Sequence, residues 1–110
     1  MAYVRVEFIT LGIGPNYHGR HENVIDKVVA SEAALSVGAT ATAAGSRPTA
    51  PTGVARIHAR ITATSGKLIA AWGADPTASQ TNGIALTEGA VEVVPVAAGD
   101  KLSFIELSEA

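Results

Sequence analysis

The sequence predicts an all-β fold: an antiparallel β-sandwich, jelly-roll-like, with long irregular loops. Two observations carry this prediction. Apolar and polar residues alternate along several short segments, and turns rich in Gly, Pro, Asn and Asp separate those segments. Such a series of short strands is typical of sandwiches and barrels. We find neither an internal repeat nor a second unit, so residues 1–110 are expected to form one domain.

The clearest alternation runs from Val54 to Thr64, where Arg56, His58 and Arg60 occupy every second position. A period of two is that of a half-buried strand, so these three side chains are expected on one face. Solvation alone explains such a charged row most simply, and a contact with a protein partner is the main alternative. Nucleic-acid binding is the least favoured interpretation.

A first antiparallel hairpin is expected where the turn Ser65-Gly66 joins that strand to the apolar segment Lys67 to Trp72. Trp72 is the sole tryptophan, and we interpret it as a core or loop-anchoring side chain. A sugar-stacking platform and an intersubunit contact are the alternatives. The stretch from Gly73 to Gly83 carries turn residues at both ends and predicts a long polar loop.

A second hairpin is expected between residues 90–96 and 101–107, joined by the turn at residues 97–100. The Gly and Asp in this turn suit a tight connection. Pro95 cannot donate a ladder hydrogen bond, because its nitrogen carries no hydrogen. Its strand is therefore expected to lie at a sheet edge or to end there.

The first half of the chain is less regular. Val4, Val6 and Phe8 alternate with polar residues and predict a strand with an inward apolar face. Residues 11–22 show no period and are expected to be irregular. The segment from Asn23 to Val37 fits both a helical face and a strand, and its β-branched content favours the strand.

Residues 43–53 are rich in Gly, Ser, Thr, Pro and Ala, with Arg47 as the one charge. This composition predicts a surface loop or an extended arm. The apolar content of 47% is dominated by small residues, and aromatic residues make up only 5% of the chain. Small side chains bury little apolar area, so an isolated monomer is expected to be marginally stable and a homo-oligomer is expected.

Composition also limits the function classes. The formal charge of −2 excludes a broad electrostatic grip on nucleic acid. No segment approaches the roughly 18 apolar residues of a membrane span, and Arg5 and Glu7 interrupt the apolar start. We therefore expect a soluble, unprocessed protein with no membrane and no direct nucleic-acid partner. Cysteine is absent, which excludes disulfides and thiolate metal sites.

The most suggestive chemical cluster is the run from His18 to Glu22, with two imidazoles and a carboxylate. Such groups bind transition metals when they converge, with His58 as a possible third imidazole. On a loop they need not converge, so a polar contact surface is the favoured interpretation. Neither a metal nor another cofactor is expected. No cupin ligand pattern and no Gly-x-Ser-x-Gly elbow occurs, so we expect no enzyme activity.

Four segments, consisting mostly of predicted strand and turn residues, resemble known proteins: Ser31–Thr42, Ala70–Ala78, Asn82–Leu86 and Pro95–Leu102. Together they resemble small virion-associated β-proteins of tailed bacteriophages, over roughly residues 28–107. The resemblance implies a capsid decoration or cement protein that binds the major capsid protein lattice, or another virion protein, and stabilises the head. It implies a place on the capsid surface of the virion, reached by assembly in the cytoplasm of the bacterial host.

Two other roles stay open: a head-fibre, spike-base or tail structural subunit, and a carbohydrate-binding module that uses Trp72. For the structural role, the expected partner-binding residues lie in two loops and on one strand. They are Tyr17, His18, Arg20 and His21 in the first loop, Arg47 in the second, and Arg56 and Arg60 on the strand.

Overall fold

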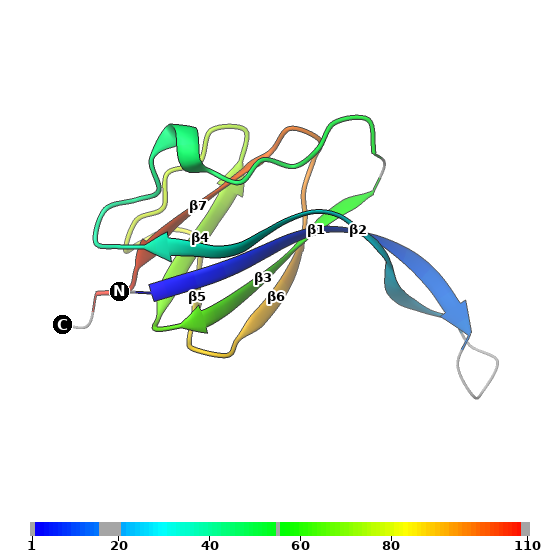
Figure 1. The fold of residues 1–110 in the computed structure, drawn as a ribbon, viewed down its shortest axis with the longest axis horizontal. Helices are drawn as coiled ribbons and strands as arrows, with labels where there is room; N and C mark the ends of the chain where they lie inside the picture. Colours follow the sequence, from blue (N-terminus) through cyan, green and yellow to red (C-terminus); the bar gives the residue numbers. More distant parts are fainter. Residues whose placement is uncertain (1, 16–20, 55, 109–110) are drawn as a thin grey trace.

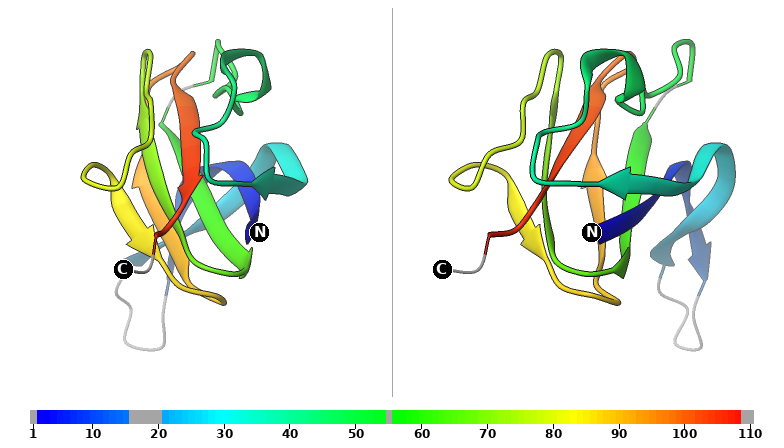
Figure 2. Two further views of the ribbon diagram at one scale, coloured as in Figure 1. Left: turned by 90° about the vertical axis from the view of Figure 1, so that its left-hand side faces the viewer. Right: turned by 60° about the vertical axis from the view of Figure 1, so that its left-hand side comes forward.

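The computed structural model describes residues 2–15, 21–54 and 56–108 and shows two antiparallel β-sheets packed face to face (Figures 1 and 2). The strands are β1 (Ala2–Pro15), β2 (His21–Val37), β3 (Ile57–Ser65), β4 (Leu68–Gly73), β5 (Ile84–Leu86), β6 (Val91–Pro95) and β7 (Lys101–Glu106). One sheet has the order β2-β1-β3-β6 and the other β5-β4-β7. The predicted all-β antiparallel sandwich is confirmed. In the described part of the chain, no helix has the length and apolar character needed to cross a membrane.

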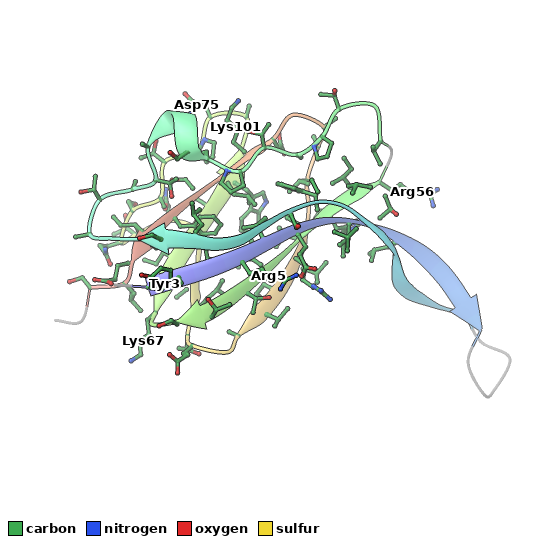
Figure 3. The ribbon with its side chains drawn as sticks, in the orientation of Figure 1. Tyr3, Arg5, Arg56, Lys67, Asp75 and Lys101 are labelled. Atoms are coloured by element: carbon green, nitrogen blue, oxygen red, sulfur yellow. The ribbon has the colours of Figure 1, made fainter. Side chains whose placement is uncertain are left out.

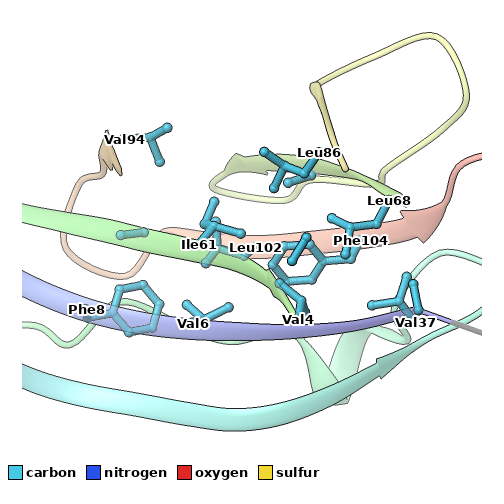
Figure 4. Packing of buried hydrophobic residues seen from close by; sticks show 14 of the residues in the cluster. Val4, Val6, Phe8, Val37, Ile61, Leu68, Leu86, Val94, Leu102 and Phe104 are labelled. Atoms are coloured by element: carbon cyan, nitrogen blue, oxygen red, sulfur yellow. The ribbon is translucent and has the colours of Figure 1, made fainter. Parts of the chain in front are cut away.

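The core lies between the two sheets and follows the alternation of the strands. Val4, Val6 and Phe8 of β1 point inward and are buried, as predicted. From the facing sheet, Leu102 and Phe104 of β7 pack against them (Figure 4). Alanines such as Ala59, Ala63 and Ala70 supply part of the remaining core, beside larger residues such as Ile61 and Leu68.

Both predicted hairpins are wrong, because each of the two turns crosses from one sheet to the other. The turn at Ser65-Gly66 joins β3 of the four-stranded sheet to β4 of the three-stranded sheet, and residues 97–100 join β6 to β7 in the same way. Turn chemistry alone does not say whether the next strand pairs with the last one or packs across the core. Instead β3 pairs with β1 and β6, while β4 pairs with β5 and β7. Pro95 ends β6 at a sheet edge, as predicted.

The N-terminal strands are longer than the sequence pattern indicated. Residues 11–22 were expected to be irregular, but β1 continues to Pro15 and β2 begins at His21. Cross-strand pairing from Leu11 with Ile25 to Pro15 with His21 supplies the order that the Gly-rich sequence does not reveal. The strand favoured for residues 23–37 over a helix is confirmed.

Residues 43–53 lie against β7 rather than extending from the domain as an arm. They include the 3-10 turn η1 (Ala44–Ser46) and the buried Ala50. The Ala50 N–H donates to the Asp100 carbonyl at 2.7 Å, and the Leu102 N–H donates to the Pro48 carbonyl at 2.9 Å. This segment therefore covers the outer edge of β7 with backbone hydrogen bonds, which its polar composition alone does not predict.

We predict that Gly83→Ala lowers the free energy of unfolding by about 3 kcal/mol, since it combines a left-handed backbone with a steric clash. Gly83 has a φ of 68°, and an added Cβ would collide with the Ala70 carbonyl of β4. Gly89→Ala is the matched control: its φ is 85°, but nothing lies within 4 Å of the added Cβ, so a loss of about 1 kcal/mol is expected. Urea denaturation measures both, and equal losses would contradict the assigned contact.

Candidate interaction surface

A buried carboxylate on the outer face of the four-stranded sheet organises the charged residues around it. Glu7 of β1 lies directly opposite Arg60 of β3 in the strand register. The Arg60 Nε and Nη2 donate to Glu7 Oε1 at 2.8 and 2.6 Å. Arg5 Nη2 lies 3.7 Å from Glu7 Oε2. One carboxylate is therefore held between two guanidinium groups from neighbouring strands.

The exposure of these side chains differs sharply. The side chain of Glu7 is 7% exposed, whereas Arg60 is 32% and Arg5 is 50% exposed. The cluster carries more positive than negative charge, so it presents guanidinium N–H groups to solvent while the carboxylate lies beneath them. Arginine with partly exposed N–H donors suits contacts with carboxylate or phosphate groups of a partner.

Large apolar side chains are also exposed on this face. Tyr3 is 40%, Val28 48%, Val91 52% and Val93 44% exposed. Register places them on one face, with Val28 opposite Ile9 at the β2 edge, and Val93 opposite Arg60 and Val91 opposite Thr62 at the β6 edge. Tyrosine and arginine among apolar side chains are typical of protein interfaces. We call this face, made of Tyr3, Arg5, Arg60 and the three valines, the outer face.

The other sheet offers no comparable surface, because residues 74–83 cover it. Ala78 of this connection is buried, and its N–H donates to the hydroxyl of the buried Ser103 on β7 at 2.9 Å. Ile69 and Ala71 of β4 are buried on the same side. Within the described residues, residues 74–83 thus cover one sheet face, whereas the other exposes charged and apolar side chains over much of its area but buries Ile9.

A two-stranded ribbon continues β1 and β2 beyond the sandwich (Figure 1). β1 pairs with β3 only from Tyr3 to Thr10, whereas its pairing with β2 continues to Pro15 and His21. We call residues 11–15 with 21–25 the ribbon. Two-stranded ribbons are marginally stable in water without a layer packed on them. Contact with another molecule would stabilise this one.

Of the first predicted partner-binding group, the structure describes only the backbone of His21. His21 begins β2 opposite Pro15, so its backbone lies in the ribbon. Tyr17, His18 and Arg20 lie outside the described residues, and the side chain of His21 is not among those described.

The other predicted partner-binding residues, Arg47, Arg56 and Arg60, lie in different parts of the structure and do not form one site. Arg60 lies on the outer face, but Arg56 precedes β3 with a φ of 57° and does not share the strand row. Arg47 is largely buried: its Nη1 donates to Asp75 Oδ1 at 2.9 Å and to the Pro76 carbonyl at 2.6 Å. It ties residues 43–53 to the 74–83 connection.

Sequence reasoning missed Arg5, Glu7 and the exposed valines, although their alternation along strands was the signal that could have found them.

A shallow depression of about 300 Å³ lies beside Trp72 and includes Pro76, Thr77 and Asn82 among its lining residues. Asn82 is engaged within the loop: its Oδ1 accepts from the Ser79 N–H and its Nδ2 donates to the Thr77 carbonyl, both at 2.8 Å. This use of the amide does not favour sugar binding. In residues 2–15, 21–54 and 56–108, no group of three metal-ligating side chains is placed to hold an ion.

Comparisons with known proteins returned no match: no family model, curated protein or solved structure proved similar to this chain. The resemblance to virion-associated proteins is therefore a prediction from the sequence alone.

We predict that Arg60→Ala lowers the free energy of unfolding by about 2 kcal/mol, because the buried Glu7 carboxylate loses its closest donor. Arg5→Ala is the matched control. Its 3.7 Å contact is solvent-exposed, so a loss below about 0.5 kcal/mol is expected. Urea denaturation at neutral pH compares the two variants. A larger loss in Arg5→Ala would show that the carboxylate depends on the other guanidinium.

Proposed function

We propose that this chain is a structural virion protein, a capsid decoration or cement protein that binds the major capsid protein lattice and stabilises the head. The observation that carries the proposal is the combination of one open sheet face with a ribbon that projects from the same sheet. β1 and β2 contribute residues to both, so a rigid sandwich holds the two contact elements in a fixed relation. The proposal assigns binding to these elements and no catalytic step.

The chemistry of the outer face supports contact with protein. Guanidinium donors of Arg5 and Arg60 lie among exposed apolar side chains, a mixture that suits a folded surface with acidic groups. The ribbon adds backbone donors and acceptors that can extend over a neighbouring subunit. A homo-oligomer on the capsid would multiply these contacts, and linked contacts raise occupancy through effective concentration.

The same contact elements would serve a head-fibre, spike-base or tail subunit, and the position in the particle distinguishes these roles. A density map of purified virions whose genome encodes this chain is the direct test. Density repeated over the capsid lattice supports decoration. Density confined to a fibre, spike or tail supports the alternative, and absence of the chain from the particle overturns the proposal.

We predict that shortening the ribbon abolishes most particle binding while leaving the sandwich folded. Residues 12–24 are replaced by Asn-Gly, because Leu11 and Ile25 are paired across the strands and a two-residue turn can join them. Affinity for purified capsids, measured by co-sedimentation, is expected to fall about tenfold or more through loss of one contact element.

Lys67→Ala is the control, since this exposed side chain lies at the end of the sheet away from the ribbon (Figure 3). Its binding is expected to match that of the wild-type chain. Circular dichroism and thermal melting verify that the shortened variant keeps its fold. Unchanged capsid binding by a folded, shortened variant would remove the ribbon from the proposal.

A further inference from the structure

One edge of the four-stranded sheet, strand β6, is regular and open. The edge of β7 is covered by residues 43–53, and β5 has only three residues. At the opposite edge, the pairing of β2 with β1 contains three register shifts. Irregular or short strands pair poorly with further strands. By contrast, β6 pairs with β3 without a shift over five residues. Among the described strands it is thus the edge best prepared to accept another strand.

The backbone groups at this edge follow from the ladder. The Ala63 N–H donates to the Ala90 carbonyl at 3.0 Å, and the Val96 N–H donates to the Ile57 carbonyl at 3.2 Å. Hydrogen-bonded and open positions alternate along an antiparallel edge strand. The backbone N–H and C=O groups of the even-numbered residues from 90 to 96 therefore point toward β3. The backbone groups of Val91, Val93 and Pro95 face away from it.

We propose that two copies of this chain pair through β6, antiparallel, about a twofold axis at Val93. The pairing joins two four-stranded sheets into one continuous sheet. It is an interaction between copies of this chain and does not depend on the virion role proposed above.

The hydrogen-bonding groups of the edge fit this symmetry. Val93 lies opposite Val93 of the partner subunit, so each can donate to the carbonyl of the other. Val91 then lies opposite Pro95 of the partner subunit, and its N–H meets a carbonyl. Pro95 has no N–H, so the Val91 carbonyl opposite it receives no backbone donor and keeps its contact with water. Every outward N–H of the strand thus finds an acceptor.

Side chains and charge also fit a second copy. The three outward positions are Val, Val and Pro, so no charges meet directly across the axis. Val91 and Val93 are among the most exposed large apolar side chains of the described chain, and pairing would bury them against their counterparts. Glu92 lies on the opposite side of the strand, facing Val94 of the partner subunit rather than another carboxylate.

The small size of the edge sets the expected strength. A five-residue strand pair buries far less than the roughly 1,200 Å² of a stable complex, so we expect a weak dimer that forms at high concentration. Two chains held side by side on a larger surface would pair far more completely, because their effective concentration is higher. An extended segment of a different protein is the other occupant that such an edge accepts, and the test separates the two.

The test is sedimentation equilibrium of the full chain between about 10 µM and 1 mM, the range in which small interfaces associate. The mass is expected to rise from 11.2 kDa toward twice that value. Val93→Lys places a charge on the axis and is expected to weaken association about tenfold or more. Val28→Lys is the matched control, since Val28 is equally exposed on the outer face but lies on β2, and its association is expected to be unchanged.

Amide hydrogen exchange gives a second, residue-specific readout. The Val91 and Val93 amides are expected to exchange quickly in dilute solution and at least several-fold more slowly at high concentration, while the Val94 amide is protected in both. A monomer mass throughout, with those two amides unprotected, would overturn the pairing and leave a foreign strand as the occupant. Association that Val93→Lys does not weaken would overturn it as well. A dimer absent from virions would contradict only the proposed function, and a monomer bound to capsids would contradict only the pairing.

Discussion

The register between β1 and β3 is the constraint on which the rest of the structure depends. It sets Val4, Val6 and Phe8 in the core and, on the other side of the same strand, brings Glu7 opposite Arg60. A slip of one residue would carry the Glu7 carboxylate into the apolar core and separate it from its donors. Burying an unpaired carboxylate is far more unfavourable than losing one apolar contact, so the ion pair and the core select the same register.

The two sides of β1 thus have different roles: one side forms the core, and the other contributes to the outer face. The three-stranded sheet is short and its outer face is closed by residues 74–83, which Arg47 ties to residues 43–53. In the four-stranded sheet the outer face carries guanidinium groups and exposed apolar side chains, although Ile9 on the same face is buried. Charged and apolar groups coexist there because the strands are already held by their core-facing side.

Sequence alternation was sufficient to find most strands but not their partners. The strand class, the inward side of β1 and the edge position of Pro95 follow from period two and from the missing proline N–H, which are local properties. Pairing is not local: Ser65-Gly66 has the composition of a hairpin turn, yet it crosses between sheets. The ribbon was missed for the opposite reason, since its glycines and proline read as irregular although cross-strand pairing orders them.

The site shows the same division. Arg60 could be placed on an outward strand face from its alternation, but its partner Glu7 is 53 positions away and only the fold joins them. Arg47, in a polar segment, was expected to meet a partner molecule, whereas Asp75 and the Pro76 carbonyl satisfy it within the chain. The contacts of a charged loop residue cannot be predicted from its sequence position alone, because the tertiary fold determines which groups lie next to it.

Strand directions connect the two proposed contacts. β1 runs antiparallel to β3, and β3 runs antiparallel to β6, so β1 and β6 point the same way. A twofold axis at Val93 would reverse that direction in the second copy, and the two ribbons would leave the joined sheet at opposite ends. Such a pair could not direct both ribbons to one site. It would bridge two separate sites on a repeating surface, where binding at the first raises the effective concentration at the second and compensates for a weak β6 contact.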